Sequence, residues 1–237
     1  LTRKLNVPED YFLYFFSSAT ECWSVLAESA VRKSSLHIFS GDFGEKWYNY
    51  SYHLNSVVAR IELEHDQLPD VEDFTPDRFK GFEIVCLTHN ETSNGARLTD
   101  DFMAELRSWA PDALVAVDAT SSLGGLALPW RLADVWFASV QKCLGLPAGL
   151  AVMLCSPRTV ERFELINYNK QYNSLLNTHK NALRYQTTHT PNVLSIYLLY
   201  RLLNDLPPIA EIDAQVRERA TMLYQFFEQN KILRPCV

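Results

Sequence analysis

Seven short runs of mostly apolar residues recur along the chain, at positions 11–16, 36–39, 57–63, 83–87, 113–117, 135–140 and 150–154. Each run is rich in Val, Ile, Leu and aromatic residues, and apolar and polar positions alternate little within it. Such runs are typical of strands that are covered on both faces, as in a parallel sheet. The pattern therefore predicts a mostly parallel sheet of seven strands.

Longer amphipathic stretches follow several of these runs. Those at 20–32, 43–55 and 99–109 have the spacing of helices, and Thr99 or Asp100 is suited to cap the third. Strands that alternate with helices predict an α/β fold with a doubly wound sheet. The last two apolar runs are joined without a helix, which predicts that one edge of the sheet is antiparallel.

Helices and loops follow Pro157. Thr190 and Pro191 are suited to the N-cap and the first position of a helix that ends near Leu203. A proline pair at 207–208 interrupts the pattern. A second helix is then predicted from apolar residues at helical spacing, namely Ile209, Ile212, Val216, Ala220, Leu223 and Phe227.

Composition narrows the possible functions. With 47% apolar and 21% charged residues, the 237-residue chain is expected to fold around a core rather than to be disordered. Its net charge of −6 argues against nucleic-acid binding, and no apolar stretch approaches the roughly 18 residues of a membrane span. The histidines lack metal-ligand spacing, so no metal site is expected. The irregularly spaced Cys22, Cys86, Cys143, Cys155 and Cys236 are expected to be reduced thiols of a cytoplasmic protein.

Polar residues follow several predicted strands, at the end where open α/β sheets bind ligands. A Ser-Ala-Thr sequence ending at Thr20 opens a helix after the first strand, Asp118 follows the fifth strand, and Lys142 follows the sixth. Each signal alone is ordinary: a helix cap, a turn residue and a solvated charge. Together they supply an anion site, an acid and an amine. Pyridoxal phosphate requires these groups for its phosphate, its pyridine nitrogen and its Schiff base.

Two segments carry a family resemblance. The sequences VDATSSLGG at 117–125 and ASVQKCLGLPAGL at 138–150 resemble the class V aminotransferases of the fold-type I pyridoxal-phosphate superfamily. The motif Asn90-Glu91-Thr92-x-x-Gly95 and the later Thr190-Pro191 resemble the phosphoserine aminotransferase branch. The Asp118 motif equally resembles the serine– or alanine–glyoxylate branch. The resemblance extends over about residues 14–201.

The resemblance implies a role for individual residues. Lys142 would form the Schiff base and move the proton, and Asp118 would keep the pyridine nitrogen protonated. Thr92 would bind the phenolic oxygen, and Phe43 would stack on the ring, with Trp47 as the competing candidate. The phosphate would be held by Gln141, Ala19, Thr20 and, across a homodimer interface, by the segment containing His189 and Thr190.

The resemblance also implies the organisation and the activity. Residues 1–206 would form a three-layer large domain that binds pyridoxal phosphate. Residues 207–237 would form a connecting helix and the start of a small domain that is largely missing. The expected reaction moves an amino group from glutamate to a 2-oxo acid, both small molecules. Thr20 stands where the phosphoserine enzymes typically carry a phosphate-loop arginine. The alternatives are a serine– or alanine–glyoxylate aminotransferase and a non-catalytic fold-type I protein.

Overall fold

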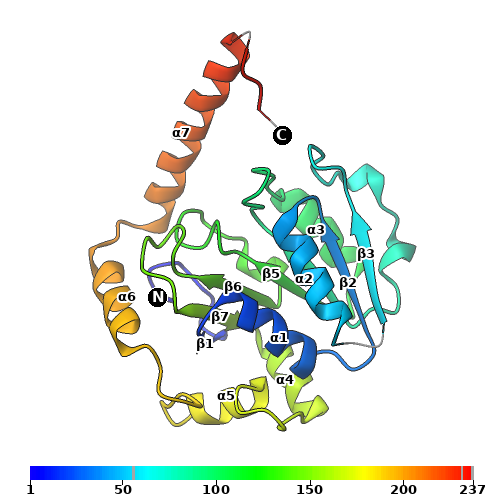
Figure 1. Ribbon diagram of the computed structural model, residues 1–237, viewed down its shortest axis with the longest axis vertical. Coiled ribbons are helices and arrows are strands. Elements are labelled where there is room, and N and C mark those ends of the chain that lie inside the picture. Colours follow the sequence, from blue (N-terminus) through cyan, green and yellow to red (C-terminus); the bar gives the residue numbers. More distant parts are fainter. Residues whose placement is uncertain (55–56, 231, 236–237) are drawn as a thin grey trace.

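The computed structural model describes residues 1–54, 57–230 and 232–235, and it contains the predicted seven-stranded sheet (Figure 1). The strand order is β1-β7-β6-β5-β4-β2-β3. The strands are β1 (Phe12–Phe16), β2 (Ser34–Phe39), β3 (Val57–Glu62), β4 (Ile84–Thr88), β5 (Leu114–Asp118), β6 (Val135–Ser139) and β7 (Ala151–Cys155). Each lies within about two residues of its apolar run, so the sequence pattern located every strand.

Two hydrophobic clusters, one on each face of the sheet, make the fold a three-layer α/β structure. Every residue of β5 is buried: Leu114 and Ala116 belong to one cluster, and Val115 and Val117 belong to the other. The first cluster is covered by α1 (Ala19–Ser29), α2 (Asp42–Tyr52), α4 (Pro157–Ile166) and α5 (Leu175–Ala182). The second is covered by α3 (Asp100–Trp109) and α6 (Val193–Asp205). Burial on both faces explains why the strands show little alternation.

One edge of the sheet is antiparallel, as predicted. β7 is antiparallel to both of its neighbours, β6 and β1. The edge strand itself is β1, which adds to the sheet beyond β7. As a result β1 is parallel to β6, and its carboxyl end reaches the same edge of the sheet as those of β2, β4, β5 and β6.

The first predicted helices differ from the structure mainly at their ends. α1 ends at Ser29 rather than at position 32, because the N–H groups of Arg32 and Lys33 donate to the Glu83 carboxylate at 2.7 Å instead of continuing the helix. α2 ends at Tyr52, and Asn55, where its end was predicted, lies outside the described residues. α3 begins as predicted, with the Thr99 hydroxyl accepting the N–H of Phe102.

The predicted start of α6 is wrong. Thr190 and Pro191 precede the helix, and Asn192 is the N-cap: its Oδ1 accepts the N–H of Ser195 at 3.1 Å. An asparagine cap is at least as favourable as a threonine cap. Pro191 also restricts Thr190 to extended conformations, so Thr190 is disfavoured as a helical residue. Thr190 is therefore not at a helix N-terminus.

After α6, the chain turns at the proline pair into α7 (Ile209–Gln229), which projects from the body (Figure 1). Of its residues only Ile209 is buried. The assignment of residues 207–237 to the start of a small domain stays a prediction. Cys22, Cys86, Cys143 and Cys155 are free thiols, and Cys236 lies outside the described residues. Within the described ranges, no helix combines the length and apolar character needed to cross a membrane.

Candidate active site

A pocket lies at the carboxyl edge of the sheet, where the chain leaves β1, β4, β5 and β6. We call it the strand-end pocket. Its empty space, including the open mouth, is about 550 Å³, within the usual size range of small-molecule sites. It is lined by Ser18, Ala19, Thr20, Trp23, Phe43, Thr88, Asn90, Thr92, Asp118, Thr120, Ser121, Ser139, Gln141 and Lys142. The fold thus gathers the polar residues that follow these strands.

Asp118 is the buried acid of this pocket, with 4% of its surface exposed. Its Oδ1 accepts the N–H of Thr120 at 2.9 Å, and its Oδ2 accepts the indole N–H of Trp23 at 3.1 Å. Burial raises the pKa of the Asp118 carboxyl, while these two hydrogen bonds act in the opposite direction and lower it. The bonds also fix the orientation of the carboxyl group.

The N-terminus of α1 forms another part of the wall. The Ser18 hydroxyl accepts the N–H of Glu21, and the Ser139 hydroxyl accepts the N–H of Ala19 at 2.7 Å. Among the described residues, the N–H of Thr20 has no hydrogen-bond partner. A free N–H at the positive end of a helix is suited to bind an anion.

Several other polar side chains line the pocket. The hydroxyls of Thr92 and Ser121 are 2.6 Å apart and form a hydrogen bond. By contrast, Thr88 Oγ1 and Asn90 Oδ1 are buried and have no hydrogen-bond partner among the described residues. Buried polar atoms are normally paired, so these two atoms are available to a bound polar molecule.

Phe43 and Lys142 approach each other at the pocket. The Lys142 Nζ lies 5.9 Å from the centre of the Phe43 ring, and the Lys46 Nζ lies 5.0 Å from it. Trp47, the competing candidate for ring stacking, is 2% exposed and stacks on Trp23 with the ring centres 6.3 Å apart. Trp47 is therefore a core residue, and Phe43 is the aromatic residue that α2 contributes to the pocket.

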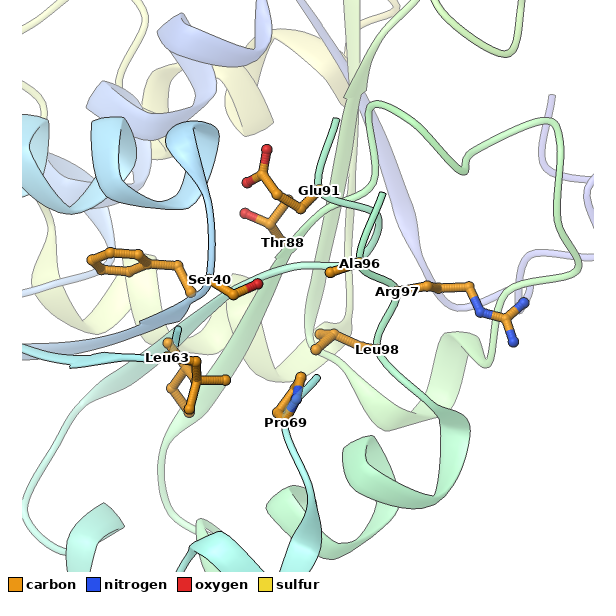
Figure 2. Close-up of a pocket in the computed structure, with 10 residues that line it drawn as sticks. Ser40, Leu63, Pro69, Thr88, Glu91, Ala96, Arg97 and Leu98 are labelled. Carbon is orange, nitrogen blue, oxygen red and sulfur yellow. The ribbon is translucent and has the colours of Figure 1, made fainter. Parts of the chain in front are cut away.

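Glu91 anchors the start of α2 although it is not itself in the pocket lining. Its carboxylate accepts the N–H groups of Phe43 and Gly44, both at 3.2 Å, and that of Ser93 at 3.0 Å. Figure 2 shows Glu91 and Thr88 together on the wall of a small neighbouring cavity. A Cβ atom at Gly41 would come within 2.5 Å of Glu91 Cγ, so only glycine permits this approach.

His189 and Thr190 lie elsewhere. They line a second groove beside β1, together with Tyr14 and Tyr185, and both are exposed. The His189 ring packs edge-on against Tyr172, with the ring centres 5.4 Å apart. The structure brings every other predicted site residue into the strand-end pocket of the same chain. A role for His189 and Thr190 at a cofactor stays a prediction that requires a second subunit.

Sequence reasoning missed Trp23, Ser139 and Glu91. Trp23 follows Ala19 by four positions, and residues four apart share one face of a helix, so its place beside the anion site could have been found. Ser139 is the last residue of β6, on the same edge as Lys142. Nothing in the sequence indicated that Glu91 would cap a helix that begins 49 positions earlier.

Comparison with known proteins places this chain in a family. The sequence profile described as aminotransferase class V matches residues 2–235. A phosphoserine aminotransferase of Corynebacterium glutamicum is 28% identical over 246 residues. The match covers all of this chain and 63% of that protein. The chain therefore spans less than two thirds of the length of this curated relative.

Solved structures agree with this placement. A phosphoserine aminotransferase from Cytophaga hutchinsonii has a TM-score of 0.92 and 32% identity, covering 97% of this chain and 65% of its own. An aspartate aminotransferase from Thermus thermophilus shares the fold, with a TM-score of 0.79 and 23% identity. The match covers 94% of this chain and 66% of that protein. Because the family profile matches nearly the whole chain, the resemblance seen in the sequence is confirmed: the chain belongs to the class V aminotransferases.

Proposed function

We propose that this protein is a pyridoxal-phosphate-dependent transaminase. One observation carries the proposal: a buried acid, Asp118, an amine, Lys142, and an aromatic ring, Phe43, meet in one pocket. Asp118 is the last residue of β5, and the other two follow β6 and β2. An acid, an amine and an aromatic face are the groups that the cofactor needs around its ring.

The residues present fit the cofactor. The N–H of Thr20 at the start of α1, with Ala19 and Gln141, would hold its phosphate. The buried, unpaired oxygens of Thr88 and Asn90 offer further polar contacts. Bound pyridoxal phosphate supplies a ring that withdraws electrons from the substrate carbon next to the amino group.

The side chains of this chain would then have distinct tasks. Asp118, held by Trp23 and Thr120, would keep a proton on the pyridine nitrogen. Lys142, on the loop after β6, would attach the cofactor through Nζ and carry the proton to and from the substrate. Thr92 and its partner Ser121 would hydrogen-bond the phenolic oxygen. Phe43 would cover one face of the ring and exclude water from it.

The substrates are proposed to be small molecules, with glutamate as the amino donor and a 2-oxo acid as the acceptor, as in phosphoserine aminotransferases. A homodimer is proposed in which Thr190 of one subunit completes the phosphate site of the other. The exposed position of His189 and Thr190, away from the pocket of their own chain, supports this arrangement. The whole assembly is proposed to act in the cytoplasm.

The proposal is tested on the full-length protein purified with pyridoxal phosphate. A visible absorption band from the covalently held cofactor should appear, and an amino acid should bleach it. A panel of amino donors and 2-oxo acids, glyoxylate included, then separates the phosphoserine-like activity from the glyoxylate-type one. A protein that binds the cofactor but bleaches with no amino acid would instead be a non-catalytic member of the fold.

A further inference from the structure

Another pocket, distinct from the groove that His189 and Thr190 line, adjoins the strand-end pocket. Asn90 and Ser121 line both this pocket and the strand-end pocket. We call it the α7 pocket, because α7 forms one wall and the loops that follow β4 and β5 form the other. Its empty space, including the open mouth, is about 1610 Å³. A molecule bound at the strand-end pocket can therefore extend past Asn90 and Ser121 into this space.

The two pockets differ in their charged groups. Among the residues that line the strand-end pocket, Lys142 is the only cation, and the proposed function commits it to the cofactor. The α7 pocket contains two guanidinium groups, those of Arg97 and Arg217. The α7 pocket thus offers an acidic group on a substrate cations that the strand-end pocket lining does not have.

Arg97 has no competing partner. Its side chain forms no hydrogen bond or ion pair with any residue in the described part of the chain. Figure 2 shows its guanidinium extending away from Ala96 and Leu98, the neighbours that close the small cavity. Arg217 is paired with Asp213, with Nε 2.9 Å from Oδ2. A free guanidinium offers paired donors that match the oxygens of a carboxylate or a phosphate.

The two arginines line opposite walls of the α7 pocket. The charges of both reach His89, which is 3% exposed and whose ring nitrogens have no hydrogen-bond partner among the described residues. Burial, and to a smaller extent the charges of Arg97 and Arg217, lower the pKa of His89 to about 4, while the Asn90 side chain acts in the opposite direction. The acidic residue of this wall, Glu228, follows Arg217 by 11 positions, or about 16 Å along α7. Glu228 is therefore too far along the helix to neutralise Arg217, whose acidic partner is Asp213.

We propose that Arg97, with Arg217 opposite it, binds the carboxylate or phosphate group of an acidic amino-acid substrate and so determines substrate specificity. The inference rests on the proposed function. Thr20 provides no charge at the start of α1, so in this chain the charge for the acidic group comes from the loop after β4.

The test uses the full-length holoenzyme and the variants Arg97→Gln and Arg97→Lys. The matched control is Arg219→Gln, which removes an exposed guanidinium from α7 outside both pockets. Glutamate and O-phosphoserine are the acidic amino donors, and alanine is the neutral one. A readout apart from activity is the binding of succinate, a dicarboxylate without an amino group, and of propionate, measured by calorimetry.

For Arg97→Gln, the KM for the acidic donors should rise at least tenfold while kcat and the KM for alanine stay within about threefold. Succinate binding should weaken at least tenfold, propionate binding and the Kd for pyridoxal phosphate should not change, and Arg97→Lys should restore part of the loss. A larger effect on O-phosphoserine than on glutamate assigns the site to phosphate, and equal effects assign it to either anion.

Two outcomes overturn the inference, and they differ in whether the proposed function survives. If the wild type turns over acidic donors and Arg97→Gln changes neither their KM nor succinate binding by more than twofold, Arg97 is not the specificity residue and the proposed function stands. If the wild type transaminates no donor and succinate binds no more tightly than propionate, the proposed function and the inference both fail.

Discussion

The Glu91 carboxylate accepts the backbone N–H of Phe43 at 3.2 Å, which joins the loop after β4 to the first turn of α2. The same carboxylate accepts the N–H of Gly44, so one buried side chain satisfies two of the free donors at this helix start. The position of Phe43 at the pocket therefore depends on a residue that does not line the pocket.

Replacing Glu91 tests this dependence. Glu91→Ala should lower the free energy of unfolding by about 2–4 kcal/mol, because buried N–H groups lose a charged acceptor. Glu91→Gln keeps one acceptor oxygen and should cost about half as much. Urea unfolding measures both changes. Glu105→Ala, at an exposed acid on α3, is the control and should stay within about 0.5 kcal/mol of the wild type. An equally small effect of Glu91→Ala would show that the contact contributes nothing.

Lys142→Ala should reduce turnover by about a thousandfold or more, because the amine both attaches the cofactor and moves the proton. Lys46→Ala is the matched control, since its Nζ also lies over the Phe43 ring, at 5.0 Å. Borohydride reduction followed by peptide mapping by mass spectrometry should find the cofactor on Lys142. Cofactor attached to Lys46 would refute the assignment.

Asp118→Asn should retain the cofactor but turn over about 10²- to 10⁴-fold more slowly. A neutral amide does not favour the protonated pyridine nitrogen, so the bound ring withdraws electrons less effectively. Steady-state kinetics and a cofactor titration measure the two properties separately. Asp112→Asn, at an exposed acid before β5, controls for loss of charge alone. Near-normal turnover in Asp118→Asn would exclude Asp118 from this role.

Although Asp118→Asn should slow turnover, it should stabilise the cofactor-free protein. Burial raises the pKa of Asp118 in the folded protein above its unfolded value of about 3.9. The folded state then binds the proton more tightly, so cofactor-free wild type loses stability as the pH rises from about 4 through the folded pKa. Asp118→Asn does not titrate. At pH values above the folded pKa of Asp118, the cofactor-free variant should therefore be more stable than the cofactor-free wild type in thermal or urea unfolding. At lower pH, the difference in stability between the two proteins should shrink.

A complementation experiment tests whether Thr190 acts across subunits. Thr190→Lys should block the phosphate site of the partner, and Lys142→Ala disables the site of its own chain. In mixed dimers of the two variants, a cross-subunit role places both lesions in one site and leaves the other intact, so activity reappears after subunit exchange. If Thr190 serves its own chain, every site carries one lesion and the mixture stays inactive.

The sequence predicted the sheet and most of the pocket because the signals for both lie within short segments of the chain. Strands buried on both faces give continuous apolar runs, and the polar residues that follow them, such as Asp118 and Lys142, must meet at one edge of a parallel sheet. The start of α6 was predicted wrongly because Thr190-Pro191 and Asn192 are both good helix starts. The choice between them depends on tertiary contacts that the local sequence does not contain.

The features of the site that the sequence did not predict depend on contacts between residues far apart in the chain. Trp23 reaches Asp118 from a position 95 residues away, and Glu91, in the loop after β4, caps a helix that precedes β4 in the sequence. Arg97 is a single charge in a loop, and its importance depends on α7 standing opposite it. The helical spacing of Trp23 from Ala19 marks its place beside the anion site, but no spacing in the sequence marks its contact with Asp118 or the other two long-range pairs.

The reversed direction of β7 determines what kind of connection carries Lys142. A parallel β7 would require a crossover of a dozen or more residues after β6, and the lysine would then lie at the start of a long excursion. Here residues 140–150 join the two strands without a helix. The N–H of Val140 donates to Leu150 O at 3.1 Å, and that of Gly145 donates to Lys142 O at 2.9 Å. Both ends of this loop continue into adjacent buried strands. The backbone of Lys142 is therefore anchored to the sheet at both ends of its loop, and no helix separates it from either strand along the chain.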